Sequence, residues 1–342
     1  MFFKKSCDIL NCMDEQGELQ TNPPSEGGQE GREKKQNAFL AFLFDILKGV
    51  GIGVAFIIPG FSGGSVAALL GVYERLVGAV ADIFKHFKKS FLTLLPILIG
   101  MIIGIAALIL PIQWGLHHYP VPTVTLFVGL TIGGIPSVWE KVKGVKFNWK
   151  YALALFLPLI AAAGLCFLPL AGDVDLLHLN VGGYFLLVVI GVVGSCALVV
   201  PGISGSMLLL IFGYYNPIVE LVTKNLLKGV NVGLSFGVLA CVALGILAGF
   251  FSISLLMKLL LKKCPHGTYF SILGFIIGSI PAVYVSTVRE AATFETASSL
   301  TALYSSPWYW VVAVLFLLLG ISLSFMLWWF SKRKAKKENQ TP

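Results

Sequence analysis

Ten apolar segments, most of them about 20 residues long, fill the chain from residue 38 onward. They lie near 38–58, 62–81, 91–112, 121–139, 149–170, 183–200, 203–222, 230–257, 268–285 and 307–330. A helix needs about 20 apolar residues to cross the hydrocarbon core of a bilayer. Only 12% of the 342 residues are charged, whereas a soluble domain carries about 25%. The sequence therefore predicts an all-α, polytopic membrane protein.

The positions of the basic residues predict how the chain is oriented. If the N-terminus is cytosolic, the cytosolic segments carry 20 Lys and Arg and the external loops carry three. These cytosolic segments are 1–37, 82–90, 140–150, 258–267 and 331–342. Such an excess marks the cytosolic side of a membrane protein, so both termini are expected there. Because the lysines sit at the ends of apolar segments, the net charge of +8 does not indicate a nucleic-acid partner.

The two ends of the chain differ from the apolar part. Residues 1–37 are rich in Glu, Gln, Gly, Asn and Lys, a composition that predicts a disordered cytosolic tail. Residues 331–342 form a basic cytosolic tail, which anchors the last span and is suited to contact anionic membrane lipids.

A short phrase occurs twice inside the apolar sequence. It reads I-I-P-G-F-S-G-G-S-V at 57–66 and V-V-P-G-I-S-G-S-M-L at 199–208. The longer stretches 57–77 and 199–219 share seven identities in 21 positions, at an offset of 142. A second match, 129–138 with 274–283, has six identities in ten at an offset of 145. Two matches at nearly one offset predict a duplication, with halves 38–175 and 176–330.

Each half holds five apolar segments. An odd number of crossings turns the second half upside down relative to the first, which is the inverted repeat of many secondary transporters. Each half also contains a helix pair broken at its Pro-Gly phrase. The pair either spans the membrane or enters and leaves on one side; the count of crossings stays odd in both cases.

The repeated phrase predicts a break in a helix at membrane depth. Pro59 and Pro201 end a helix arriving from upstream, and Gly60 and Gly202 allow the turn that follows. The serines after them can cap a new helix, whose free N–H groups suit an anion. We therefore expect an anion cradle formed by both loops near the midplane. Its residues are Ser62, Gly63, Gly64, Ser65, Ser204, Gly205 and Ser206. The alternative is a pair of helix kinks that permit close packing.

Four charged residues lie within apolar sequence, where charges are costly and usually functional. Lys48 and Arg75 are candidates for the counter-charge of a phosphate, and Asp45 and Glu74 are candidates for coupling to protons. The alternative is mutual neutralisation, for example of Asp45 by Lys48 three residues later. The six cysteines show no metal-ligand spacing, so no metal and no cofactor are expected.

Cleavage of a lipid phosphate needs a fixed cation and a nucleophile or base beside the scissile bond. A class of membrane pyrophosphatases for polyprenyl lipids carries a similar Pro-Gly-x-Ser loop with an arginine after the serine. Here Gly63 and Gly205 occupy that position, and no acidic cluster accompanies the loop. The pattern favours binding and passage of an anion, not an enzyme.

Each Pro-Gly-x-Ser-Gly loop is followed by a Gly-x-Tyr motif that begins eight residues after the last glycine of the loop. With these paired loops, the chain resembles the bacterial polyprenyl-phosphate transporter family over about 38–330. The resemblance implies a flippase that returns undecaprenyl phosphate from the outer to the inner leaflet of the bacterial cytoplasmic membrane. The inverted repeat adds the expectation of alternating access, and a proton or sodium gradient is the expected coupling partner. The chain departs from many relatives at Phe56, where they have an aspartate. A small-anion transporter and a lipid-phosphate phosphatase are the alternatives.

Overall fold

The computed structural model describes residues 27–56, 62–165, 167–169, 171–222, 229, 232–293 and 306–338. The chain divides into two units, Met1–Phe42 and Leu43–Pro342. Within the first unit the described residues belong to helix α2, Gly27–Ala55, and the rest of this section concerns the second. Helix α2 begins at Gly27, inside the tail expected to be disordered.

All regular elements among the described residues are helices, as the sequence predicts. After α2 they are α3 (Gly63–Leu69), α4 (Tyr73–Ala81), α5 (Phe87–His118), α6 (Pro120–Trp139), α7 (Trp149–Leu165), α8 (Val181–Val199), α9 (Gly205–Ile211), α10 (Tyr215–Glu220), α11 (Val232–Lys263), α12 (Pro265–Thr293) and α14 (Pro307–Glu338). Six of these, α5, α6, α8, α11, α12 and α14, are long and apolar enough to cross a membrane. The protein is a multi-pass membrane protein.

Two of the ten expected segments are not single helices. Segment 62–81 is divided into α3 and α4, and segment 203–222 into α9 and α10. The division falls at Gly71 and Gly213, whose φ angles of +69° and +74° lie in the left-handed region that favours glycine. Each seven-residue helix before the division is about 10 Å long, which is too short to cross a bilayer.

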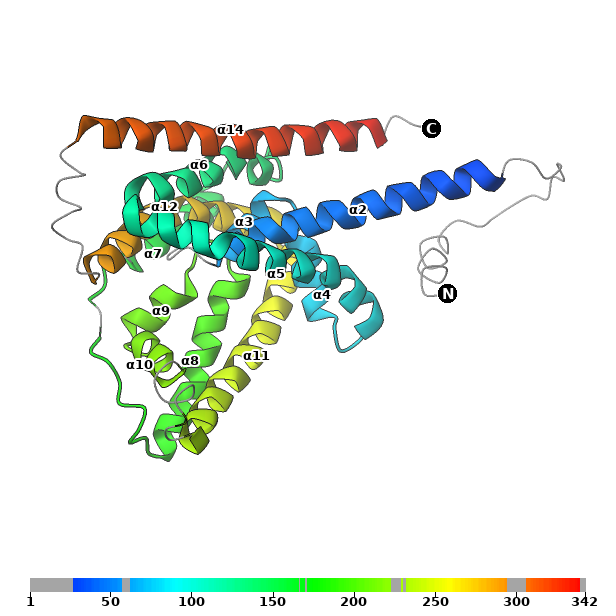
Figure 1. Ribbon diagram of the computed structural model, residues 1–342. Helices are drawn as coiled ribbons and strands as arrows, with labels where there is room; N and C mark the ends of the chain where they lie inside the picture. Colours follow the sequence, from blue (N-terminus) through cyan, green and yellow to red (C-terminus); the bar gives the residue numbers. More distant parts are fainter. Residues whose placement is uncertain are drawn as a thin grey trace. The chain divides into compact units, whose positions relative to one another are not determined.

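The long helices pack in pairs through glycines that let two backbones touch. In the α6–α14 pair, a methyl group at Gly129 or Gly133 would overlap the backbone of Leu317 or Ile321. In the α7–α12 pair, Gly274 meets the backbone of Leu155 in the same way. Small residues at this spacing are the usual means of close packing between membrane helices. Figure 1 shows α14 lying along α6.

A second set of glycine contacts joins α2 to α5 and α8 to α11. Gly49 and Gly100 bring α2 and α5 together, and Gly191 and Gly245 bring α8 and α11 together. Gly49 and Gly191 are 142 residues apart, and Gly100 and Gly245 are 145 apart. The contacts thus recur at the two offsets of the sequence repeat, as a duplication requires. Figure 1 shows α8 and α11 side by side.

The pairing also crosses between the two sequence halves. Helix α6, the fourth segment of the first half, packs on α14, the fifth of the second half. Helix α12, the fourth segment of the second half, packs on α7, the fifth of the first. The halves therefore exchange their fifth helices. The inverted orientation of the halves in the membrane stays a prediction.

The glycine contacts make a testable prediction. Gly129→Ala is expected to destabilise the protein by about 1–3 kcal/mol, because the new methyl group forces the α6 and α14 backbones apart. Gly164→Ala on α7 is the control, since a methyl group there meets no other atom within 4 Å. The stability of the control variant should be unchanged or should rise by up to about 1 kcal/mol, because alanine has a higher helix propensity than glycine. The measurement is the temperature at which detergent-solubilised protein aggregates; equal midpoints for both variants would contradict the packing argument.

Candidate functional site

The first Pro-Gly loop leads into α3. Pro59 and Gly60 lie outside the described residues. Ser62 holds the N-cap position with an extended backbone (φ −107°, ψ 124°), but its side chain makes no capping hydrogen bond. Its hydroxyl instead donates to the backbone oxygen of Ala197, at 3.4 Å. The expected start of α3 is confirmed, whereas the expected capping role of the Ser62 hydroxyl is wrong, because the end of α8 offers it another acceptor.

The second loop leads into α9 and keeps its cap. Pro201 and Gly202 form a turn, and Gly202 has a φ of +84°, as expected. Ser204 is the N-cap residue of α9, and its hydroxyl accepts a hydrogen bond from the backbone N–H of Met207 at 3.5 Å. Gly205 opens α9, and Ser206 follows it, with a side chain outside the described part.

The structure brings the two loops together. A methyl group at Gly64 would lie 3.3 Å from the backbone oxygen of Val199 and 3.4 Å from Cα of Pro201. The hydroxyl of Tyr73 donates to the same oxygen of Val199, at 2.8 Å. Ala197 and Val199 end α8, where backbone oxygens have no partner within the helix. Side chains of the first half thus donate hydrogen bonds to backbone oxygens at the end of α8, in the second half.

The contact between the loops is buried. Ser62 and Ser65 are 3% and 1% exposed, and Ser204 is 9% exposed. Gly63 and Gly64 are buried as well, and the ring of Phe56 packs against Gly63. Among the described residues, the Ser65 hydroxyl has no hydrogen-bond partner. A buried hydroxyl without a partner costs free energy, so the loop contact keeps one unused polar group.

Ion pairs hold three charged residues expected at the site: Asp45, Glu74 and Arg75. The Arg75 guanidinium lies 2.5 Å from a carboxylate oxygen of Asp45, which joins the start of α4 to α2. Glu74 lies 3.2 Å from the ammonium of Lys141 and accepts a hydrogen bond from the hydroxyl of Tyr269. These two pairs agree with the alternative of mutual neutralisation for Asp45, Glu74 and Arg75, and the functional roles of these residues stay predictions. The partner of Asp45 is Arg75, where the sequence suggested Lys48.

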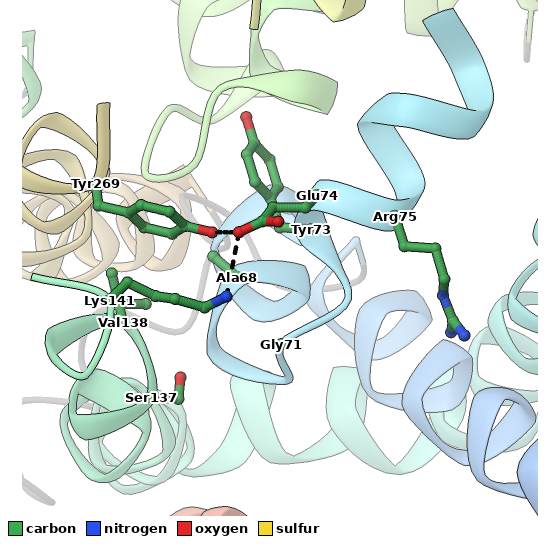
Figure 2. A pocket seen from close by; sticks show the side chains of 9 residues that line it. All are labelled: Ala68, Gly71, Tyr73, Glu74, Arg75, Ser137, Val138, Lys141 and Tyr269. Atoms are coloured by element: carbon green, nitrogen blue, oxygen red, sulfur yellow. Dashed lines mark hydrogen bonds and ion pairs between the residues drawn. The ribbon is translucent and has the colours of Figure 1, made fainter. Parts of the chain in front are cut away.

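A cavity of about 420 Å³ lies beside the turn between α3 and α4 (Figure 2). Its lining residues are Ala68, Gly71, Tyr73, Glu74, Arg75, Ser137, Val138, Lys141 and Tyr269. The same short helix thus reaches the buried loop contact at its first turn and the cavity at its last. Lys48 lies on α2 and does not belong to this lining. Glu74 and Arg75 are the expected site residues that the cavity contains.

Within the cavity, Glu74 is the centre of a small polar cluster. Figure 2 shows its carboxylate between the Tyr269 hydroxyl and the Lys141 ammonium, whereas Arg75 points away from them. The Lys141 ammonium also lies 5.6 Å from the centre of the Tyr269 ring. The side chains of Glu74 and Lys141 are 53% and 52% exposed. Such a cluster exchanges partners readily, because an exposed ion pair contributes little stability.

Sequence reasoning did not assign seven of the nine lining residues to the site, among them Ser137, Lys141 and Tyr269. Ser137 lies in the repeated stretch 129–138, which marks it only as part of a packing motif. Lys141 appears in the sequence only as one of the basic residues of 140–150, and no pattern distinguishes Tyr269. Both reach Glu74 because α6 and α12 pack beside α3 and α4, which the linear sequence does not reveal.

Two further ion pairs lie in segments expected to be cytosolic. Lys258 of α11 donates to the carboxylate of Asp82 at 2.5 Å, and this hydrogen bond holds the pKa of Asp82 below its usual value. Lys332 of α14 pairs with Glu140 and lowers the pKa of that carboxyl as well. Both pairs join helices of the first half to helices of the second.

Comparison with known proteins gives three findings. A family model described as undecaprenyl phosphate translocase-like matches residues 52–302. A polyprenyl-phosphate transporter of Staphylococcus aureus is 32% identical over 246 residues, which are 70% of this chain and 85% of that protein. A polyprenyl-phosphate transporter of Vibrio cholerae is 30% identical over 138 residues, 36% of this chain and 42% of that protein. No solved structure is significantly similar to the chain.

The hydrogen bond between the halves can be tested. Tyr73→Phe leaves the Val199 oxygen buried without that donor and is expected to cost about 1–3 kcal/mol. Thermal aggregation of the purified variant should therefore begin several degrees below that of the unaltered protein. Tyr119→Phe is the control, because Tyr119 is 43% exposed. If both variants melt alike, the Tyr73 hydroxyl does not hold the halves together.

Proposed function

This chain belongs to the undecaprenyl phosphate translocase-like family, and we propose that it is a flippase for undecaprenyl phosphate or a related polyprenyl phosphate. It returns the lipid from the outer to the inner leaflet of the cytoplasmic membrane for reuse in envelope polymer synthesis. The observation that carries the proposal is the family match over residues 52–302, which contains both Pro-Gly loops and all nine residues of the cavity lining. The names of the two relatives support the same substrate.

The substrate explains why a protein is needed. A phosphate monoester carries about −1.5 to −2 charges at neutral pH, and such a group cannot enter hydrocarbon without compensation. Its prenyl tail, in contrast, is apolar and soluble in the hydrocarbon core of the membrane. The proposed task of the protein is therefore to cover the headgroup alone, while the tail stays in the membrane beside the helices.

We assign the loops to the headgroup at mid-membrane. The proposed headgroup ligands are Ser62, Gly63, Gly64 and Ser65 of the first loop and Ser204, Gly205 and Ser206 of the second. In the described arrangement Gly64 lies against Pro201 and the Ser62 hydroxyl is engaged with Ala197. A headgroup reaches these groups only when the loops separate, so transport is proposed to proceed by alternating access. The unpartnered Ser65 hydroxyl is a donor that a phosphate oxygen would satisfy.

Inward movement of the headgroup needs a driving force. Moving one charge across a potential of 100 mV involves about 2.3 kcal/mol, and the cytosol is the negative side. Coupling to a proton or sodium gradient would offset this cost. Asp45 and Glu74 remain the proposed coupling carboxylates, since both face a basic partner that a bound cation or proton would release.

Two alternatives give different outcomes in one assay. A lipid-phosphate phosphatase would release phosphate from the substrate without any added enzyme. A small-anion transporter would move inorganic phosphate and leave the lipid in its leaflet. We propose passage over cleavage, because glycine follows each loop serine where the lipid pyrophosphatases have arginine.

The loop assignment can be tested with Ser62→Ala combined with Ser204→Ala. Loss of two hydroxyl contacts to a charged headgroup is expected to slow transport about tenfold or more. The measurement is the rate at which polyprenyl phosphate in the outer leaflet of protein-containing vesicles becomes inaccessible to added phosphatase.

The matched control is Ser252→Ala combined with Ser322→Ala. These serines lie exposed on α11 and α14, and their hydroxyls donate to backbone oxygens of their own helices. The control should transport at the unaltered rate. An unchanged rate in the folded loop variant would remove the loops from the substrate path.

The proposed orientation can be tested with Cys264. This cysteine is exposed and lies in the segment 258–267 expected to be cytosolic. In a variant that keeps Cys264 as its only cysteine, a membrane-impermeant maleimide should label the protein in lysed cells but not in intact cells with a permeable outer envelope. A cysteine-free variant with His178→Cys, in the predicted external loop 171–182, should be labelled in intact cells. The reverse labelling pattern would show that the orientation in the membrane is opposite to the proposed one.

A further inference from the structure

We propose that the cavity beside the α3–α4 turn is a second binding site for the phosphate monoester headgroup, on the cytosolic side of the loops. In this site Lys141 and Tyr269 hold the phosphate, and Glu74 takes its place between transport cycles. The inference rests on the proposed function, because it assigns the substrate's headgroup to a place where the translocated lipid leaves the protein.

The donors around Glu74 are those that a phosphate requires. The Glu74 carboxylate receives the Tyr269 hydroxyl and faces the Lys141 ammonium at 3.2 Å. A phosphate monoester presents three acceptor oxygens, so it can replace a carboxylate between these two donors. Glu74 is about half exposed, and its side chain can therefore move out of the cavity toward solvent. The volume of about 420 Å³ lies within the range of small-molecule sites.

The start of α4 adds to the attraction for an anion. This nine-residue helix begins at Tyr73, and its N-cap residue Val72 has no side chain that can cap it. The first backbone N–H groups of a helix carry a partial positive charge, and Glu74 in the first turn is the anion that now benefits from it. A phosphate in the cavity would occupy the same favourable end of the helix.

The charges lining the cavity are balanced in the described arrangement. Lys141 faces Glu74, and Arg75 faces Asp45 on the side toward α2. Withdrawal of Glu74 alone leaves Lys141 with an excess positive charge and leaves the Arg75–Asp45 pair intact. The exchange of one carboxylate for a phosphate is thus enough to bind the headgroup, and Lys141 is the residue on which the site depends.

The equivalent turn of the second half is closed. A methyl group at Gly213 would overlap the backbone oxygen of Gly172, whereas one at Gly71 meets no atom within 4 Å. The backbone of 171–174 also bonds to this turn, through Ala171 N–H to Ile211 O and Val174 N–H to Gly213 O, each at 3.0 Å. In place of Glu74 and Arg75, the second half has Asn216 and Pro217.

Of these two turns, the first alone combines an open face with charged side chains. Lys141 begins the segment 140–150, and Tyr269 closely follows the segment 258–267; both segments are expected to be cytosolic. The closed turn lies against the predicted external loop 171–182. The site therefore opens toward the leaflet to which the lipid is returned.

The test uses full-length protein in detergent and farnesyl phosphate as the probe, with farnesol as the phosphate-free control. Lys141→Gln should weaken binding of farnesyl phosphate about tenfold or more, because it removes the charged donor. Glu74→Gln should strengthen binding, because it removes the competing carboxylate and keeps an acceptor for Tyr269. Lys146→Gln, at an exposed lysine of the same segment, should bind as the unaltered protein does. The affinity for farnesol should be the same in all three variants as in the unaltered protein.

The opposite signs separate a binding site from a structural ion pair. If the pair only stabilises the fold, both Lys141→Gln and Glu74→Gln lower the melting temperature and neither changes affinity selectively. Lys141→Arg keeps the charge and should retain binding of farnesyl phosphate. This variant keeps the proposal testable if Lys141→Gln does not fold. Unchanged affinity in folded Lys141→Gln, or weaker binding in both variants, overturns the assignment.

The vesicle assay on the same variants distinguishes the two proposals. If the unaltered protein transports polyprenyl phosphate while Lys141→Gln binds farnesyl phosphate normally, the cavity is not the site and the flippase proposal stands. If the unaltered protein neither transports nor binds, both proposals fail. Slow transport in Lys141→Gln, with the loop serines intact, supports both.

Discussion

A helix that stops inside a membrane leaves backbone oxygens that water cannot reach, and this constraint shapes the centre of the protein. The end of α8 presents the oxygens of Ala197 and Val199, and the hydroxyls of Ser62 and Tyr73 reach them from the other half. Unpaired polar backbone at that depth would cost several kcal/mol per group. The unpaired end of α8 in one half is therefore satisfied by hydroxyl groups of the other half.

Much of the fold follows from residue pattern alone. All ten apolar segments contain helices, and the glycines at 129, 133, 274 and 278 make the close contacts that their small-xxx-small spacing indicates. The breaks at Gly71 and Gly213 were not foreseen, because glycines within apolar segments usually indicate close helix packing. Their effect on φ becomes visible only in the folded backbone.

The site was predicted less completely than the fold. The meeting of the two loops agrees with the duplication, and Glu74 and Arg75 do line a cavity. Their partners could not be read from the sequence: Asp45 is 30 residues from Arg75, and Tyr269 is 195 residues from Glu74. Such pairings are set by which helices pack together, and that choice depends on long-range contacts that periodicity does not encode.

The exchange of fifth helices between the halves has a consequence for the protein's ancestry. Helix α6 covers its glycine face with α14, and α12 covers its own with α7, so the glycine face of each fourth helix is covered by a helix of the other half. A one-repeat precursor built to this plan would have been incomplete as a monomer. Two copies of such a precursor could each have supplied the fifth helix of the other, and gene fusion would then have joined them in one chain.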